Sequence, residues 1–228
     1  SAASDVYKRQ DEKHGFYVDF YRSDNAISND YLYHNIGDSV ILYTQDGKVL
    51  KQEEVSSYPC VGEDRPGLRY FRSVRTTGLN ENTVVALFSA RPLNTGTSYM
   101  KMWMPASSDV SYFTALAPGA KTASSPYQNK PSLVVTMRKE KPAVKEPFVA
   151  VYEPISDKVS AGLIESVDRV KLDPQGEEGC AIKVNTKEGD TFTLVNILKD
   201  GPVILNNQKC CGDFAIFAKR KGKNSVYV

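Results

Sequence analysis

The sequence predicts an all-β protein: an antiparallel β-sandwich, that is, a two-layer β-sheet, of about 14 strands with little helix. Apolar and polar residues alternate with a period of two in most segments, which is the pattern of half-buried strands. No stretch keeps a 3.6-residue apolar period for three full turns. Polar turns separate the alternating segments at short intervals, which is typical of a sandwich rather than of an α/β fold.

The expected strands follow one another along the chain. In order they are 15–22, 30–36, 39–44, 48–55, 68–75, 83–89, 98–104, 110–116, 132–139, 147–152, 163–171, 180–186, 191–197 and 214–219. Gln45-Asp46-Gly47 and Glu188-Gly189-Asp190 supply residues that tolerate positive φ, so each is expected to close an antiparallel hairpin. Prolines and charges cluster from Arg138 to Pro147, which predicts a surface loop or a boundary, with a subdivision of the chain near 140–147.

Length and charge narrow the class of partner. The chain has 228 residues and a formal net charge of +2, so it can bury a substantial core but has no strong field for nucleic acid. No run approaches the roughly 20 apolar residues of a membrane helix, so no membrane span is expected. Residues 5–10 match one translated frame of a transposon end used in sequencing libraries. Residues 1–10 are therefore expected to be a non-native leader and 11–228 part of a longer protein, so that any export signal would lie upstream.

The four cysteines lack the paired short spacings of zinc or thioredoxin-like sites. They are Cys60, Cys180, Cys210 and Cys211, and buried free thiols are favoured over a disulfide. The chain has two histidines, His14 and His34. Strand alternation places His34 in an apolar row with Leu32 and Ile36, so it is expected to be a structural histidine in or at the edge of the core.

The same alternation places Phe16, Val18 and Phe20 inward and the other row outward. That outward row, Tyr17, Asp19 and Tyr21, is the candidate substrate-binding surface, because sugar rings stack on aromatic faces and offer hydroxyls to carboxylates. The alternative is that a second packed sheet covers this row.

Two further groups of residues favour structural interpretations. Met100, Met102 and Met104 share one side of their strand, with Tyr99 and Trp103 on the other, and packing is favoured over a cofactor site. Arg65, Arg69, Arg72 and Arg75 would form an anion site only if they converged, but alternation separates Arg72 from Arg69 and Arg75, so a solvated face is expected.

The sequence contains no glycine-rich phosphate loop before a helix and no nucleophile elbow. Beyond His14 and His34 it has no third histidine for a Ser-His-Asp or Cys-His arrangement. We therefore assign no catalytic residue and no metal ligand. The residues alone predict a soluble β-sandwich protein.

Two segments carry a resemblance to a known family. FYVDFYRSDNAISNDYLYHNIGD, at 16–38, resembles the "YyVDifR...hDYlyHn.G" segment of heparinase II/III-like polysaccharide lyases. PFVAVYEP, at 147–154, followed by Ile164 to Leu172, is similar to a segment nearer the C-terminus of the same family. The order of the two segments agrees with that family.

The resemblance implies that the chain is the C-terminal β-sandwich part of a lyase that cleaves uronic-acid-containing glycans by β-elimination and that it supports the substrate cleft. The family's catalytic residues, its helical toroid domain and its zinc site, where present, precede this segment. His34-Asn35 is followed by Ile36 and so does not form the family's His-Asn-Thr motif. The resemblance therefore implies no cofactor in this part, an acidic polysaccharide and the upstream toroid as partners, a periplasmic or secreted location, and no activity of this part alone. The alternative function is a non-catalytic carbohydrate-binding or adhesion sandwich.

Overall fold

The computed structural model describes residues 7–10, 15–59, 67–92, 96–121, 123, 125–156, 162–172, 179–198, 203–205, 208–210 and 213–227. These residues form antiparallel sheets, and their helical structure is limited to the short 3₁₀ turn η1 (Leu68–Tyr70). The predicted all-β antiparallel sandwich is confirmed. No helix in this part of the chain has the length and apolar character needed to span a membrane.

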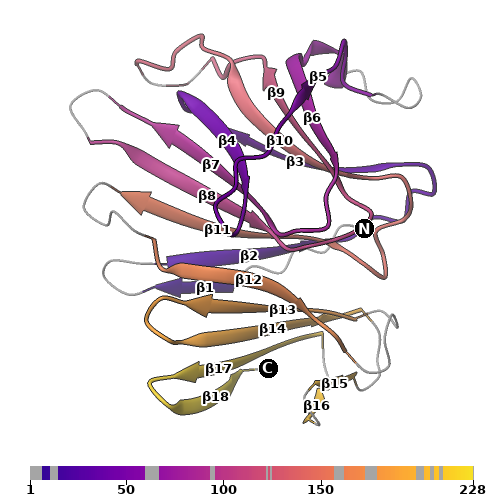
Figure 1. The fold of residues 1–228 in the computed structure, drawn as a ribbon, viewed down its shortest axis with the longest axis vertical. Coiled ribbons are helices and arrows are strands. Elements are labelled where there is room, and N and C mark those ends of the chain that lie inside the picture. The colour runs from indigo at the N-terminus through magenta and orange to yellow at the C-terminus, as the bar shows by residue number, and fades with distance from the viewer. Residues whose placement is uncertain are drawn as a thin grey trace.

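Three sheets and one small hairpin make up the fold (Figure 1). Sheet A has the order β1 (Tyr7–Gln10), β2 (Gly15–Tyr21), β11 (Phe148–Ser156), β8 (Ser98–Met104), β7 (Val84–Ala90) and β4 (Ser39–Thr44). Sheet B has the order β3 (Asn29–Asn35), β10 (Ser132–Lys139), β9 (Ser111–Ala117), β6 (Arg72–Leu79) and β5 (Glu53–Glu54). Sheet C has the order β12 (Ile164–Val170), β13 (Gly179–Thr186), β14 (Thr191–Ile197), β17 (Phe214–Arg220) and β18 (Lys223–Tyr227), and β15 (Val203–Leu205) pairs with β16 (Gln208–Cys210).

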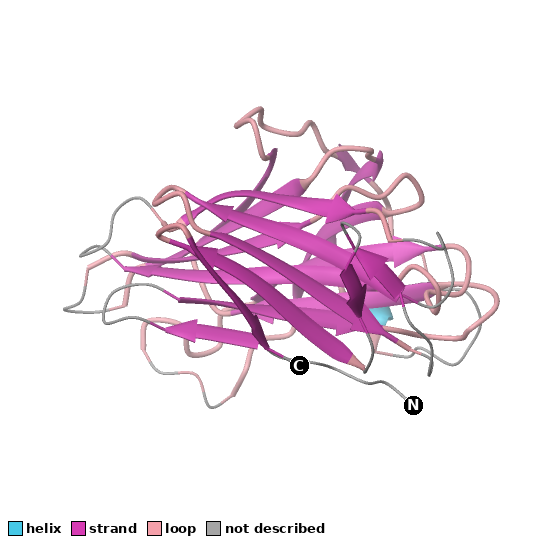
Figure 2. Cartoon of the chain, turned by 90° about the horizontal axis from the view of Figure 1, so that it is seen from below, coloured by secondary structure: helices cyan, strands magenta, loops and turns pink. Residues whose placement is uncertain are grey.

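Sheet A is the middle layer of the molecule, because both of its faces are buried. Phe16, Val18 and Phe20 lie in one core cluster with side chains of sheet C, whereas Phe148 and Ala150 lie in another with side chains of sheet B. The view from below shows the strands stacked in layers with loops at their ends (Figure 2). The sandwich therefore has three layers in place of the two expected, and alternating residues of one strand enter different cores.

Several segments depart from the predicted strands. Of 48–55, only Glu53–Glu54 forms a strand, and 68–75 begins as η1 before β6 starts at Arg72. The strands β15, β16 and β18 were not predicted. Residues 7–10, part of the predicted leader, form the edge strand β1 and pair with β2.

Both predicted turns form. Gly47 and Gly189 have φ values of 90° and 82°, and the second turn joins β13 to β14 as a hairpin. The first turn makes a shorter hairpin, closed by the bridge between Tyr43 and Val49, while the other edge of β4 pairs along its length with β7.

The proline-rich and charged segment crosses between layers, since it joins β10 of sheet B to β11 of sheet A. Its first two residues are not part of a surface loop: Arg138 is 1% exposed and Lys139 is fully buried at the end of β10. The predicted subdivision near 140–147 stays a prediction, and the chain enters sheet C only after β11.

Candidate functional site

The row Tyr17, Asp19 and Tyr21 on β2 faces sheet B and is half-buried. Tyr17 and Tyr21 pack on the core between sheets A and B, whereas Phe16, Val18 and Phe20 are buried as predicted. Of the two interpretations given above, the outward-facing surface is wrong and the covering by a second packed sheet is confirmed, because sheet B covers the row. Its role in substrate binding stays a prediction.

The covered row belongs to a hydrogen-bonded tyrosine group. Tyr31 donates its hydroxyl proton to Asp19 Oδ2 at 2.7 Å. Because a hydroxyl has only one proton, Tyr152 must be the donor in its 2.7 Å contact with Tyr31. Tyr17 stacks on Tyr152 with ring centroids 4.6 Å apart. Burial raises the pKa values of Tyr17, Tyr31 and Tyr152 above the ordinary value, so these phenols stay protonated and hold the two sheets together as hydrogen-bonding groups.

His34 is exposed and is not part of the core row that alternation predicted. The row of β3 that enters the main core is the aromatic one, with Tyr31 and Tyr33, while Leu32 packs on a smaller cluster on the outer face of sheet B. His34 lies at the edge of that cluster, with its ring centroid 6.0 Å from that of Phe71. The part of the imidazole that is buried there lowers its pKa, so the ring is neutral at pH 7. His14 lies outside the described residues.

The methionine row packs as predicted: Met102 and Met104 are fully buried between sheets A and B. Trp103, on the other side of β8, is buried in the core between sheets A and C. Cys180 is a buried free thiol, as expected, and Cys210 is buried. The other two cysteines lie outside the described residues.

Arg69, Arg72 and Arg75 are exposed, as expected for a solvated face, and Arg65 lies outside the described residues. Arg72 and Arg75 lie opposite Leu116 and Thr114, which are two residues apart on β9. The β-bulge between them shifts the alternation, so the predicted separation of Arg72 from Arg75 is not observed.

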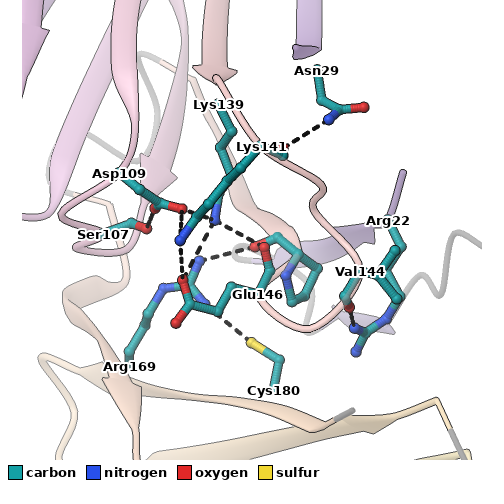
Figure 3. A network of polar contacts seen from close by, with 11 residues as sticks. Arg22, Asn29, Ser107, Asp109, Lys139, Lys141, Val144, Glu146, Arg169 and Cys180 are labelled. Atoms are coloured by element: carbon teal, nitrogen blue, oxygen red, sulfur yellow. Dashed lines mark hydrogen bonds and ion pairs between the residues drawn. The ribbon is translucent and has the colours of Figure 1, made fainter. Parts of the chain in front are cut away.

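A buried charge cluster lies where the loops of sheets A and B meet sheet C (Figure 3). The ammonium of Lys139 lies 3.1 Å from Asp109 Oδ2 and donates to the backbone carbonyl of Glu146 at 2.9 Å. Lys141 lies 3.0 Å from the same carboxylate oxygen. Burial lowers the pKa of Lys139, and the charge of Asp109 opposes that effect. One carboxylate therefore keeps two ammonium groups in place.

The lowered pKa of Asp109 predicts that the free energy of unfolding falls at acid pH. Burial alone would raise its pKa, but the hydroxyl of Ser107 and the ammonium groups of Lys139 and Lys141 together lower it from 3.8 to about 2. Because the folded pKa lies below the unfolded value, this contribution of about 2 kcal/mol is present above about pH 4 and is lost as the pH falls towards 2. Urea unfolding between these pH values should show a shallower fall in stability for Asp109→Asn than for the wild type. The exposed Asp24→Asn is the control, and equal slopes for all three proteins would contradict the assignment.

Next to this cluster lies a hollow of about 470 Å³, here called the junction hollow. Its charged and hydroxyl lining is Ser107, Ser108, Lys145, Glu146, Arg169 and Lys171. Arg169 is fixed at the end of β12, since Nη2 donates to the carbonyl of Pro147 at 3.0 Å and Nη1 to Cys180 Sγ at 3.2 Å. Its buried Nε has no hydrogen-bond partner. Three cations against one carboxylate make the hollow suitable for a carboxylate or sulfate group.

The junction hollow contains binding groups but no pair of side chains arranged as nucleophile and base. Among the described residues, no group of three or more His, Cys, Asp or Glu side chains could hold a metal ion. The cations that line the junction hollow suit the binding and positioning of an anionic group.

Sequence reasoning missed the residues of both the charge cluster around Asp109 and the junction hollow. Asp109, Lys139, Lys145 and Arg169 come from different loops and strand ends, and only the order of the strands brings them together. Arg169 and Lys171 are two residues apart in an expected strand, so their shared face could be predicted. Their meeting with Lys145 could not.

No protein-family model matches the chain. The chain is 37% identical over 152 residues to an endo-acting ulvan lyase of Formosa agariphila, and the match covers 64% of this chain and 18% of that protein. The chain thus spans less than a fifth of the length of this curated relative. The similarity supports a relationship to polysaccharide lyases, but not specifically to the heparinase II/III-like group.

Proposed function

We propose that this chain is the β-sandwich region of a heparinase II/III-like polysaccharide lyase whose whole form cleaves a uronic-acid-containing glycan by β-elimination. The observation that carries the lyase part of the proposal is the 37% identity to an ulvan lyase over 64% of this chain. The heparinase II/III-like group is proposed from the two motifs that resemble it. Ulvan is accordingly the first substrate to test. Because such an enzyme meets its polymeric substrate outside the cytoplasm, the proposal includes export to the periplasm or the medium.

β-Elimination at a uronic acid needs three contributions: neutralisation of the carboxylate, removal of the C5 proton by a base, and protonation of the departing glycosidic oxygen. The junction hollow offers cations for the first of these. The base and the acid are assigned to the remainder of the enzyme, as in the family that the two motifs resemble. The sandwich then supports one wall of the cleft, where a small displacement of the substrate would be costly to the rate.

The test compares this chain with the whole protein on ulvan, alginate and heparan sulfate. Unsaturated uronides absorb in the ultraviolet, so the expected result is a rise in absorbance with the whole protein on at least one glycan and none with this chain alone at stoichiometric amounts. Failure of the whole protein on every uronate polymer would contradict the proposal. A clear rise with this chain alone would refute the assignment of the reacting groups to the remainder.

The rival function, a carbohydrate-binding or adhesion sandwich that does not cleave, makes a different prediction for the same gene. Upstream β-modules without a helical toroid, together with glycan binding and no product, would favour that rival. A toroid with tyrosine and histidine residues, followed by a His-Asn-Thr segment, would favour the lyase.

A further inference from the structure

The outer face of sheet C is divided into two halves of opposite character. In one half, Ala181, Val195 and Ala215 form a cross-strand row on β13, β14 and β17. This row is buried beneath the β15–β16 hairpin, which contributes Leu205 and Cys210 to the same core cluster. The apolar half is therefore already covered.

The other half is polar; its two lysines are exposed, whereas Thr193 is buried. Lys183, Thr193 and Phe217 form one cross-strand row, and Asn185, Thr191 and Lys219 form the next. A hollow of about 600 Å³ lies over these strands, and its lining includes both lysines, both threonines and the half-buried ring of Phe217. This size is within the range of sites that bind small organic ligands.

Part of the polar half is preorganised by hydrogen bonds between strands. Asn185 Nδ2 donates to Ser166 Oγ at 2.8 Å, and Thr191 Oγ1 donates to Asn185 Oδ1 at 3.2 Å. The row therefore presents fixed hydroxyl and amide groups across β12, β13 and β14. Binding a ligand here costs little side-chain entropy for these groups.

The charge of this face is unbalanced. Lys183 and Lys219 are exposed, and among the described residues neither forms an ion pair with a carboxylate. The nearest carboxylate by register is Asp168, opposite Lys183. Asp168 already accepts hydrogen bonds from Gln45 Nε2 at 3.0 Å and from Ser166 Oγ at 2.9 Å. Neither ammonium group is held by a carboxylate of the described residues, so both can contact an external anion.

The two lysines are separated across the polar half. They lie two strands and two residues apart, so their Cα atoms are about 12 Å apart at a strand spacing of about 4.8 Å and a rise of about 3.4 Å per residue. Flexible lysine side chains can span that separation, so the two ammonium groups can contact one anion or separate anionic groups of one ligand. An oligosaccharide with repeated anionic groups fits the second arrangement, and Phe217 and the threonine hydroxyls lie between the lysines, where they can contact its rings.

We propose that the polar half of the outer face of sheet C binds an acidic polysaccharide chain, with Lys183 and Lys219 contacting separate anionic groups of it. The choice of a polysaccharide as ligand rests on the proposed function, whereas the anionic character rests on the geometry of this face. The site would hold a polymer on the enzyme next to the junction hollow, with which it shares the lining residue Val170.

The experiment uses this chain and measures the Kd of fluorescently labelled ulvan and alginate oligosaccharides by anisotropy. Lys183→Gln with Lys219→Gln is the test variant, and Lys51→Gln with Lys121→Gln is the control, since both pairs are exposed and remove equal charge. The expected result is a Kd raised about tenfold or more in the test variant only, with the wild-type affinity falling as salt rises. Circular dichroism and thermal melting of both variants confirm that they fold.

Three outcomes would overturn the inference: no binding of either acidic oligosaccharide by the wild type, equal Kd values in test and control variants, or equal affinity for a neutral β-glucan. Tighter binding of single-stranded DNA than of the glycans would also overturn it in favour of a nucleic-acid surface. The measurement needs no catalysis. If this inference fails, the rise in ultraviolet absorbance with the whole protein still tests the proposed function separately.

Discussion

Replacing Arg138 with alanine is expected to lower the free energy of unfolding by about 3–5 kcal/mol, because it leaves a buried carboxylate without its cation. Arg138 is the next-to-last residue of β10 and lies opposite Asp30 of β3. Their closest charged atoms, Nη1 and Oδ1, are 3.5 Å apart, and the two side chains are 1% and 2% exposed. The guanidinium also donates to the carbonyl of Pro59 and lies 5.9 Å from the ring centroid of Tyr58.

Urea unfolding of three variants, each compared with the wild type, separates the contribution of the buried Asp30–Arg138 pair from that of Glu140, the exposed partner of the same arginine. Glu140 accepts from Arg138 Nε at 2.6 Å but is 65% exposed, so Glu140→Ala should cost less than about 1 kcal/mol. The double variant Asp30→Asn with Arg138→Met removes both charges and should recover part of the stability lost by Arg138→Ala. If Arg138→Ala and Glu140→Ala cost the same, the buried ion pair does not have the role assigned to it.

Alternation predicted which residues share a face of a strand, but not what covers that face. The rows of β2 are correct: Phe16, Val18 and Phe20 lie on one side, and Tyr17 and Tyr21 on the other. Each face of sheet A has its own covering sheet, so the second row is covered too. Periodicity within one strand contains no information about the number of layers, which depends on the order of strands distant in sequence.

The same limit explains why alternation did not predict the exposure of His34 or the burial of the charged end of β10. His34 follows Leu32 on its face, where the described residues form the smaller cluster around Tyr58 and Phe113, and the imidazole lies at the exposed edge of that cluster. Arg138 and Lys139 look solvated in the sequence, yet both are buried because carboxylates from β3 and from the loop before β9 reach them. Composition favours a loop there, and only tertiary ion pairs allow the strand to end with two buried cations.

Replacing Glu153 with alanine is expected to loosen sheet C from sheet A and to lower the free energy of unfolding by about 3 kcal/mol. Glu153 is 1% exposed on β11. Its Oε1 accepts from the backbone N–H groups of Leu163 and Ile164, the second at 2.9 Å, and Oε2 accepts from Trp103 Nε1 at 3.3 Å. Without the carboxylate, three buried donors lose their acceptor, and each such loss costs about 1–3 kcal/mol when no water replaces it.

The position of Gly162 supports this interpretation, because a Cβ there would lie 2.8 Å from Glu153 Oε1 at a φ of +64°. The carboxylate and the start of β12 thus fit closely only with glycine between them. The single tryptophan of the chain, Trp103, reports the change directly: its fluorescence should shift towards that of a solvated indole in Glu153→Ala at low urea. Glu165→Ala, on the exposed side of β12, should leave both the emission and the midpoint unchanged within about 0.5 kcal/mol. An unaltered Trp103 emission and midpoint in Glu153→Ala would show instead that apolar packing alone joins the two sheets.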